Sequence, residues 1–373
     1  MITVFGSKVG KEEITNVVSS MEQQWMGFGK KVDQFEASFQ AKFNIDNFLM
    51  VDSGSNALFM AVTLLNLPTG SEIIVPSFTW VSCAQAVLLA GMTPVFCDVD
   101  IDTMNVTTET IAPKITKKTR AIMVVHYAGL PVDIDEIKHF NLPIIEDAAH
   151  AVDSKYKGLH CGSIGNVGIY SFDAVKNLTA GEGGGIASPN PELIERARML
   201  RYCGIGKSGF DAAVSNAKGK KRWWEYNISE PFIKMLPTNI AAGIALAQLE
   251  KIDDLQQTRK EIWSNYQTQF AENDWIKTPV EANNGDRHSY FTYCIRTEKR
   301  DDLAHFLLDH GVYTTLRYHP LHLNPIYKQT DVRLPNCEQL NEDCLSIPLH
   351  PRLTQSETET IINLIIDFGK ANF

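Results

Sequence analysis

The sequence predicts an α/β protein with a large, mainly parallel sheet and a smaller C-terminal α+β domain. Short apolar runs alternate with helical patterns along the first two thirds of the chain, which is typical of a parallel sheet with helices on both faces. The length of 373 residues exceeds what one hydrophobic core usually holds. After residue 255 the alternation gives way to helices and a single strand pattern. We therefore expect a large domain over residues 1–255 and a small domain over residues 256–373.

Two helices are expected before the sheet begins. Residues 11–18 have helical spacing and an acidic first turn, which favours a helix N-terminus. Large apolar side chains on one stripe predict a second helix that contains Val32, Phe35, Phe39 and Phe43. Between the two helices, glycines among large apolar residues at 25–29 form either a packed turn or a lid.

Apolar runs then predict the strands of the sheet, at residues 47–51, 72–76, 94–98, 121–126, 143–147 and 167–170. His126 ends one of these runs, and we interpret it as a packing histidine whose hydrogen bonds are satisfied. Further helices are expected at residues 191–202 and 239–255. The second of them should lead into a long helix through Tyr266 that bridges to the small domain.

The small domain is expected to contain few elements. Residues 289–295 alternate as a half-buried strand, residues 301–310 are helical, and an amphipathic helix at 361–368 closes the chain. Residues 316–322 are dense in polar and aromatic groups and have prolines nearby, which favours a loop. His322 in this loop either contacts a substrate or is a surface histidine.

The composition excludes several classes of partner. A net charge of −9 argues against general affinity for nucleic acid or acidic membranes. The basic stretch at 218–222 is too weak a signal for nucleic acid, and fits a loop over an anionic substrate or a subunit contact at least as well. Seven dispersed cysteines indicate reduced thiols in the cytoplasm. We see no signal peptide, no apolar run of about 18 residues for a membrane span, and no metal-binding spacing of histidines.

The segment around Lys176 is the first candidate site. The apolar run at 167–170 ends shortly before Lys176, and small, glycine-rich residues follow. Such a lysine either snorkels to the surface at a strand end, or is held in a dry pocket where desolvation lowers its pKa and makes it a nucleophile for a carbonyl. The glycines could cradle a phosphate, but no Gly-Lys-Ser/Thr follows them, so a P-loop is weakly supported.

Two acids end another predicted strand. Glu146 and Asp147 close the run at 143–147, and parallel strands place ligand groups at their carboxyl ends. A carboxylate there, together with Lys176, suits pyridoxal 5′-phosphate (PLP), which needs a Schiff-base lysine and an acid on its pyridinium nitrogen. The alternative for the two acids is a helix N-cap. The two segments together favour the cofactor.

Two further stretches fit an anionic, aromatic ligand. Ser53, Gly54 and Ser55 precede a helical pattern and offer backbone N–H groups and hydroxyls to an anion. Plain N-capping by one of the serines explains this stretch equally well. Trp80 begins the helical pattern after the strand at 72–76, where it either stacks on an aromatic cofactor or packs in the core.

Taken in order, these pieces resemble the DegT/DnrJ/EryC1/StrS family of PLP-dependent nucleotide-sugar aminotransferases. The matching stretches keep the family's order and spacing from about residue 7 to the last helix, and they are residues 53–58, 76–80, 146–150, 171–184, 241–249 and 318–322. The ordered set is much more specific than any one stretch. The resemblance implies a fold-type I PLP-dependent transferase with a seven-stranded sheet, acting as a homodimer with active sites at the subunit interface.

The resemblance also implies roles for the residues around the cofactor ring. Lys176 would form the Schiff base and, once released, carry a proton between the substrate carbon and the cofactor. Asp147 would hold the pyridinium nitrogen, Trp80 would stack on the ring, and His150 would lie beside the ring's hydroxyl group. A branch of the family with histidine in place of the lysine acts as a dehydratase, and Lys176 argues against that branch.

The cofactor phosphate would be bound by Gly54, Ser55 and Ser171. Lys234 falls where a contact from the neighbouring subunit to the phosphate is expected, and Asn227 is a second candidate for it. Many relatives carry Asn-Tyr-Arg-Met before the helix that begins near residue 239, whereas this chain has Lys-Met-Leu-Pro. Because that arginine is missing, the site for the donor's carboxylate stays unassigned.

Tyr318 and His322 belong to the stretch that resembles the family's substrate loop. In the reaction that the resemblance implies, an amino acid, commonly glutamate, supplies the amino group and a keto group of a nucleotide-linked sugar receives it. The leading hypothesis is amination at C4 of a 4-keto-6-deoxy sugar, for lipopolysaccharide O-antigen, another cell-surface polysaccharide or an amino sugar. The alternatives are amination at C3 or of another keto sugar, and a PLP-binding regulatory protein without turnover.

Overall fold

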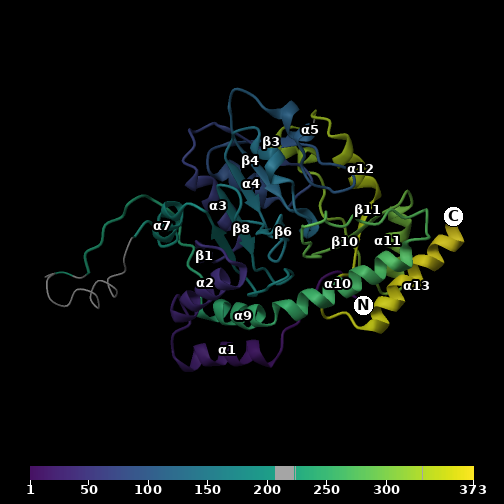
Figure 1. The fold of residues 1–373 in the computed structure, drawn as a ribbon, viewed down its shortest axis with the longest axis horizontal. Helices are drawn as coiled ribbons and strands as arrows, with labels where there is room; N and C mark the ends of the chain where they lie inside the picture. The colour runs from purple at the N-terminus through teal and green to yellow at the C-terminus, as the bar shows by residue number, and fades with distance from the viewer. Residues whose placement is uncertain (206–221, 223, 330) are drawn as a thin grey trace.

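The computed structural model describes residues 1–205, 222, 224–329 and 331–373, and one seven-stranded sheet dominates it (Figure 1). The strands of this sheet are β1 (Phe48–Val51), β2 (Glu72–Pro76), β3 (Thr93–Cys97), β4 (Thr119–Val125), β5 (Ile144–Asp147), β8 (Val167–Ser171) and β9 (Gly184–Ala187). Their spatial order is β1-β9-β8-β5-β4-β2-β3. Every pair of neighbours is parallel except the two that involve β9. The predicted mainly parallel sheet is therefore confirmed, and the six predicted strands all belong to it.

β9 is a strand that the sequence pattern did not predict. Its first residues, Gly184 and Gly185, carry no side chains that could show an apolar period. A Cβ on Gly184 would lie 2.3 Å from the carbonyl oxygen of Ser53, and a Cβ on Gly185 would lie 2.3 Å from the ring of Phe48. The glycines therefore allow the backbone and the ring of neighbouring segments to approach closely. That close approach explains why glycine occupies positions 184 and 185.

Helices surround this sheet, and their bounds are α1 (Lys11–Glu22), α2 (Lys30–Phe43), α3 (Gly54–Leu64), α4 (Ser82–Leu89), α5 (Thr108–Ile111), α6 (Ile134–Lys138), α7 (Pro191–Leu200) and α9 (Asn239–Glu250). The predicted apolar stripe of α2 is buried in the core. Both α1 and α2 pack against α9, whose small residues permit close contact (Figure 1). α3 packs on β8 and β9, which fixes its N-terminus beside the end of β8.

The loop at 25–29 is hydrogen-bonded to the start of α9, while the side chains of Trp25 and Met26 are exposed. The Asn239 side chain donates a hydrogen bond to the carbonyl oxygen of Trp25 over 3.1 Å and accepts one from the backbone N–H of Lys31 over 3.1 Å. The indole N–H of Trp25 donates to the carbonyl oxygen of Phe28 over 2.7 Å. These bonds tie the backbone of the loop to the start of α9, and the choice between a packed turn and a lid stays open.

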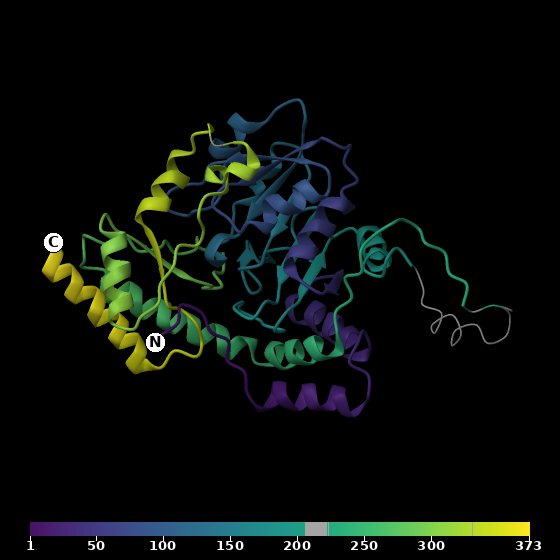
Figure 2. The same ribbon diagram turned by 180° about the vertical axis from the view of Figure 1, so that it is seen from behind.

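The C-terminal part has an apolar core of its own. Its elements are α10 (Ile252–Phe270), β10 (Tyr293–Arg296), α11 (Arg300–Asp309), α12 (Pro335–Asp343), β11 (Cys344–Ile347) and α13 (Gln355–Asn372). β10 and β11 pair antiparallel, and side chains of α10, α11 and α13 pack with them in one buried cluster. Figure 2 shows α13, in yellow, at the end of the molecule opposite α7. The domain boundary at residue 255 stays a prediction.

Two sequence predictions need correction. The strand expected at 289–295 begins only at Tyr293, because the backbone before it bonds to a loop of the large sheet: Phe291 N–H donates to the carbonyl oxygen of Ala128 over 2.9 Å. The helix expected at 239–255 is two helices, since α9 ends at Glu250 and α10 begins at Ile252.

Within the described residues, the helices are all too short or too polar to cross a bilayer. Six of the seven cysteines are buried and the seventh, Cys203, is partly buried. Apart from Arg222, the basic stretch at 218–222 lies outside the described residues.

Candidate active site

A cavity of about 260 Å³ lies at the carboxyl ends of three adjacent parallel strands. Val125 of β4 pairs with Asp147 of β5, Asp147 pairs with Ile169 of β8, and all three residues line the cavity. The carboxyl edge of an open parallel sheet is where ligands bind in α/β folds. The pairing of these three strands therefore brings the residues at their carboxyl ends together and fixes the position of the site.

Asp147 ends β5 and turns its carboxylate toward this cavity. Only 4% of the residue is exposed. Its Oδ1 accepts a hydrogen bond from the backbone N–H of Ala149 over 2.9 Å, and its Oδ2 accepts one from Sγ of Cys83 over 3.1 Å. No helix starts at this point, so the N-cap alternative is wrong. The two donors hold the carboxylate in one orientation and leave acceptor capacity on both oxygens.

Lys176 enters the same cavity from the loop that follows β8. Burial, followed by the positive charge of Arg317, lowers its pKa, and the carboxylates of Asp147 and Asp173 act in the opposite direction, which leaves the pKa at about 8. The amine lies 4.7 Å from the centroid of the Phe291 ring. The structure thus supports the buried amine rather than the lysine that snorkels to the surface. An amine with this pKa is partly neutral near pH 7 and can attack a carbonyl.

The N-terminus of α3 borders the cavity opposite these groups. Ser53 caps the helix, its Oγ accepting from the backbone N–H of Asn56 over 3.2 Å, so the capping role is confirmed for Ser53. Gly54, Ser55 and Ser171 line the cavity. A Cβ on Gly54 would lie 2.7 Å from Cβ of Ser171, so only glycine permits this approach. Backbone N–H groups and hydroxyls gathered at a helix N-terminus form an anion site.

Trp80 and Tyr318 form another wall of the cavity. Trp80 is 54% exposed, so the core-packing alternative for this residue is wrong. Its ring centroid lies 5.4 Å from that of Tyr318, at an interplanar angle of 51°. A large aromatic face open to a cavity is available to stack on a planar ligand.

His150 is buried beside the cavity in a directed chain of hydrogen bonds. Arg317 Nη1 donates to the Tyr318 hydroxyl over 3.0 Å, and that hydroxyl lies 3.1 Å from His150 Nε2. Burial, followed by the charges of Lys176 and Arg317, lowers the pKa of His150 well below its usual range. Nδ1 of the neutral ring has no hydrogen-bond partner in the part of the chain that the structure describes, so this atom is available to a ligand.

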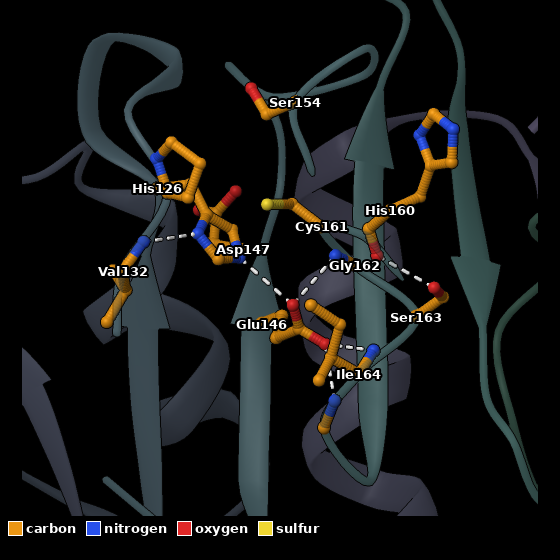
Figure 3. A network of polar contacts seen from close by, with 12 residues as sticks. His126, Val132, Glu146, Asp147, Ser154, His160, Cys161, Gly162, Ser163 and Ile164 are labelled. Carbon is orange, nitrogen blue, oxygen red and sulfur yellow. Dashed lines mark hydrogen bonds and ion pairs between the residues drawn. The ribbon is translucent and has the colours of Figure 1, made fainter. Parts of the chain in front are cut away.

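Glu146, the neighbour of Asp147 on β5, has a structural role (Figure 3). Its carboxylate accepts hydrogen bonds from His126 Nε2 over 3.0 Å and from the backbone N–H groups of Gly162 and Ile164 over 2.8 and 2.6 Å. Burial raises its pKa, but the bonds from His126 and the backbone outweigh burial and leave the pKa below its usual value. His126 Nδ1 accepts from the N–H of Val132 over 3.0 Å, which confirms His126 as a satisfied packing histidine.

Three predicted site residues do not reach this cavity. His322 is fully buried, with Nδ1 2.7 Å from Oγ of Ser77, so it is neither a surface histidine nor part of the cavity lining. Lys234 and Asn227 are exposed and lie outside the lining of their own chain's cavity. Their expected contact is with the phosphate of a neighbouring subunit, which a single chain leaves as a prediction.

Several cavity residues escaped the sequence-based prediction, namely Thr79, Ser82, Asp173, Glu182 and Arg317, together with Cys83 behind Asp147. Arg317 stands in the loop at 316–322 that was singled out for its polar and aromatic density, so a signal for it existed. Cys83 reads as an ordinary apolar helix residue. Its role follows only from the packing of α4 against the end of β5.

A larger hollow of about 490 Å³ lies elsewhere, between α10 and residues 281–290. Acidic side chains prevail in its lining, where Asp153, Asp253, Glu281 and Asp286 outnumber Lys260 and Arg287. Asp153 is held by Arg287 over 2.5 Å, and the hollow contains none of the strand ends. We therefore assign the chemistry to the smaller cavity at the sheet edge.

Comparison with known proteins gives one consistent result. The model of the DegT/DnrJ/EryC1/StrS aminotransferase family matches residues 7–366. The dTDP-4-dehydro-2,3,6-trideoxy-D-glucose 4-aminotransferase of Saccharopolyspora spinosa is 34% identical over 380 residues, covering 100% of this chain and 97% of the relative.

Solved structures agree. The aminotransferase TlmJ from Streptoalloteichus hindustanus superposes with a TM-score of 0.92 at 34% identity, covering 100% of this chain and 99% of that chain. The sugar aminotransferase Spr1654 from Streptococcus pneumoniae in its PMP form has a TM-score of 0.91 at 28% identity, with 100% of both chains covered. In its PLP form it has a TM-score of 0.89 at 27% identity, covering 99% and 98%.

The aminotransferase family found by these comparisons agrees with the presence of Lys176 and Asp147 in the cavity. They confirm the predicted family, the fold-type I architecture and the aminotransferase class of the enzyme. The match extends over nearly the whole chain rather than over the sheet alone. The chain belongs to the DegT/DnrJ/EryC1/StrS aminotransferase family.

Proposed function

We propose that this sugar aminotransferase moves the amino group of an amino acid, with glutamate as the favoured donor, to C4 of a nucleotide-linked 4-keto-6-deoxy sugar. The observation that carries the proposal is the cavity, which brings Lys176, Asp147 and the N-terminus of α3 together at the carboxyl edge of the sheet. The name of the relative from Saccharopolyspora spinosa, a 4-aminotransferase of a 4-dehydro sugar, supports the choice of carbon. Products of this class are building blocks of cell-surface polysaccharides such as O-antigen and of other amino-sugar compounds.

The residues of the cavity fit PLP, the cofactor that the sequence predicts and that a relative is named as binding. Gly54 makes a cradle beside Ser171 that any side chain would fill, and the open face of Trp80 suits a planar ring. The buried Nδ1 of His150 has no hydrogen-bond partner in the described residues, and a ring hydroxyl group would supply one. PLP, when bound, supplies an electron sink for the carbon that exchanges its amino group.

Each residue then has a defined task. Gly54, Ser55 and Ser171 bind the phosphate through N–H groups and hydroxyls. Asp147 keeps the ring nitrogen protonated, because the bonds from Ala149 and Cys83 stabilise its carboxylate. Tyr318 lies between Trp80 and His150 in the cavity lining and would contact the sugar.

Lys176 is the group that moves protons in this account. Its pKa of about 8 lets Nζ take up a proton and return it near neutral pH, which is the requirement for a general acid–base catalyst. The ring of Phe291, whose centroid lies 4.7 Å from the amine, covers one side of it and limits the access of water there.

We also propose that the enzyme acts as a homodimer in the cytoplasm. A second hollow, of about 260 Å³, adjoins the cavity through Ser55 and is lined by the apolar side chains of Phe59, Leu89 and Ile233. Lys234 follows Ile233 directly and is exposed. If a second copy of the chain covers this hollow, Lys234 of the first copy would lie close to the phosphate site of the second. Free cysteine thiols are consistent with a reducing compartment.

The experiment that tests the proposal is a panel of nucleotide-linked keto sugars incubated with holoenzyme and glutamate, with mass detection of the products. We expect an amino sugar from a 4-keto-6-deoxy substrate and 2-oxoglutarate from the donor. Product only from 3-keto sugars would move the reaction to C3. If the protein binds PLP but no amino acid ever reacts, a regulatory role replaces the enzymatic one.

A further inference from the structure

Arg317 is a buried cation that takes no part in the roles assigned to Lys176, Asp147 and the N-terminus of α3. Only 8% of the residue is exposed, and it lines the cavity together with Lys176 and Tyr318. Its guanidinium lies 3.5 Å from the centroid of the Phe5 ring, and Nη1 donates to the Tyr318 hydroxyl over 3.0 Å. A guanidinium has five N–H donors, so most of them stay available to a ligand.

The described residues place no carboxylate oxygen within 4.0 Å of this guanidinium, although Asp147, Asp173 and Glu182 line the same cavity. Other buried arginines are paired: Arg201 with Glu36 over 2.5 Å and Arg296 with Asp343 over 2.9 Å. A buried charge without a counter-ion is costly. The environment of Arg317 therefore favours the binding of an anionic ligand.

Arg259 shows what a purely structural arginine looks like in this chain. It is also buried without an acid, but its Nη1 donates to the carbonyl oxygens of Phe291 and Leu349 over 3.4 and 3.2 Å, and it does not line the cavity. Arg317 instead turns its free donors toward the ligand space.

The position of Arg317 is fixed before any ligand arrives. The hydroxyl of Tyr127 donates a hydrogen bond to its carbonyl oxygen. Phe5, which covers the guanidinium, belongs to an N-terminal strap that is held at both ends: Ile2 bridges to Val312, and Ser7 Oγ donates to the carbonyl oxygen of Ala174 over 2.7 Å. A guanidinium group that is held in place loses little entropy when it binds a planar anion through two N–H groups.

The location selects which anion this is. The amine of Lys176 and the guanidinium of Arg317 lie 4.7 and 4.9 Å from the centroid of the same ring, Phe291. Both side chains also line the same cavity, so we expect an anion held by Arg317 to be attached close to the carbon that exchanges its amino group. The α-carboxylate of an amino acid is bonded to that carbon, whereas the diphosphate of a nucleotide sugar is several bonds away from a C4 keto group. The cofactor phosphate has its own cradle at Gly54 and Ser55.

We propose that Arg317 binds the α-carboxylate of the amino acid donor and thereby selects α-amino acids over amines that lack this carboxylate. This inference deepens the proposed function and rests on it. The carboxylate leaves with the 2-oxo acid, so Arg317 matters for the half-reaction with the donor and much less for the half-reaction with the keto sugar. The residue binds and positions the donor, while Lys176 moves the proton.

The test compares two donors on holoenzyme, L-glutamate and 4-aminobutyrate, which keeps the side-chain carboxylate and the amine but lacks the α-carboxylate. Loss of the cofactor's yellow absorbance reports the half-reaction at each donor concentration. Wild type should strongly prefer glutamate. Arg317→Gln should reduce this preference by about 100-fold, and Arg317→Lys, which keeps the charge but loses the fork, by about 10-fold.

The control variant is Arg333→Gln, which removes a positive charge from an exposed residue that pairs with Glu338. It should leave the preference unchanged. As a second readout, the pyridoxamine phosphate form of Arg317→Gln should react with the keto sugar within about threefold of wild type. If Arg317→Gln does not fold, the same comparison is decided by Arg317→Lys.

The outcomes separate the two proposals. A yellow wild-type enzyme that no amino acid bleaches overturns the proposed function, and the role of Arg317 with it. A wild type that bleaches with glutamate, combined with an unchanged preference in both Arg317 variants, overturns only the role of Arg317. An equal loss in both half-reactions would show that the residue supports the fold of the site rather than the donor.

Discussion

Sγ of Cys83, on α4, donates a hydrogen bond over 3.1 Å to Oδ2 of Asp147, at the end of β5. A buried thiol is a weak donor, yet here it faces a carboxylate that would hold the nitrogen of the cofactor ring. Oγ1 of Thr79 lies 3.3 Å from the same sulfur and completes the support of the acid from the side of α4. The orientation of the acid therefore depends on a helix that looks purely apolar in the sequence.

Replacing Cys83 by Ala should reduce turnover by about 2- to 10-fold while the cofactor stays bound, because one hydrogen bond to a charged group is lost. Steady-state kinetics with the accepted keto sugar measures the effect. Cys97→Ala is the matched control, since Cys97 is equally buried but does not contact Asp147. Equal losses in the two variants would show that packing, not the bond to Asp147, matters.

Asp147→Asn should bind PLP and fold normally but lose at least about 100-fold in turnover, since the neutral amide no longer stabilises a protonated ring nitrogen. Rapid-mixing absorbance with the donor would show whether the loss lies in the amino-transfer step. Asp98→Asn, directly after β3 and outside the cavity, serves as the control for removing a partly buried negative charge. Turnover close to that of wild type in Asp147→Asn would remove this residue from the proposed role.

Glu146 should support stability rather than catalysis, in a way that depends on pH. Its folded pKa is lowered, so its contribution is present above the unfolded value of 4.5 and is lost as the pH falls through the folded value. At pH 7, Glu146→Ala should lower the free energy of unfolding by about 3–5 kcal/mol, because several buried donors lose their hydrogen-bond acceptor. Urea unfolding measures this, and the exposed Glu261→Ala should change it by less than about 0.5 kcal/mol.

Below pH 4.5 the difference between wild type and Glu146→Gln should shrink, because wild type alone loses the ionised carboxylate. If the free energies of unfolding of wild type and Glu146→Gln differ by the same amount from pH 7 to pH 3, the ionised Glu146 carboxylate does not stabilise the fold.

The apoprotein should contain one unusually reactive amine. The pKa of Lys176 is lowered to about 8, so the fraction of neutral amine, and with it the rate of trinitrophenylation at this residue, should rise with a midpoint near pH 8. Arg317→Gln should move the midpoint upward, because the charge of Arg317 lowers this pKa. Peptide mapping identifies the labelled residue, and Lys176→Ala provides the blank. A midpoint above pH 10 in wild type would show that the amine is solvated.

The sheet and the acid–lysine pair could be predicted from the sequence because both depend on local patterns. Apolar runs mark the parallel strands, and parallel strands bring their carboxyl ends to one edge, so Asp147 and the loop of Lys176 had to meet. β9 could not be predicted in this way, since its glycines are required by the approach of Ser53 and Phe48, which belong to segments far away in the chain.

The residues supplied by the C-terminal part were the hardest to predict. Arg317 and Phe291 reach the cavity only because the second core packs against the sheet edge, and neither has a motif of its own. His322 illustrates the opposite error: a histidine in a polar loop suggested a substrate contact, but Ser77 binds it in the interior. Loop composition shows that a site is near, whereas only the packing shows which side chains face it.

The central claim is that the amine of Lys176 is the group that binds the cofactor covalently. Borohydride reduction of the yellow holoenzyme, followed by digestion and peptide mass mapping, tests it most directly. The account predicts one pyridoxyl label per chain, on the peptide that contains Lys176, and none in Lys176→Ala. A label on another lysine, or cofactor that washes away unlabelled after reduction, would contradict it.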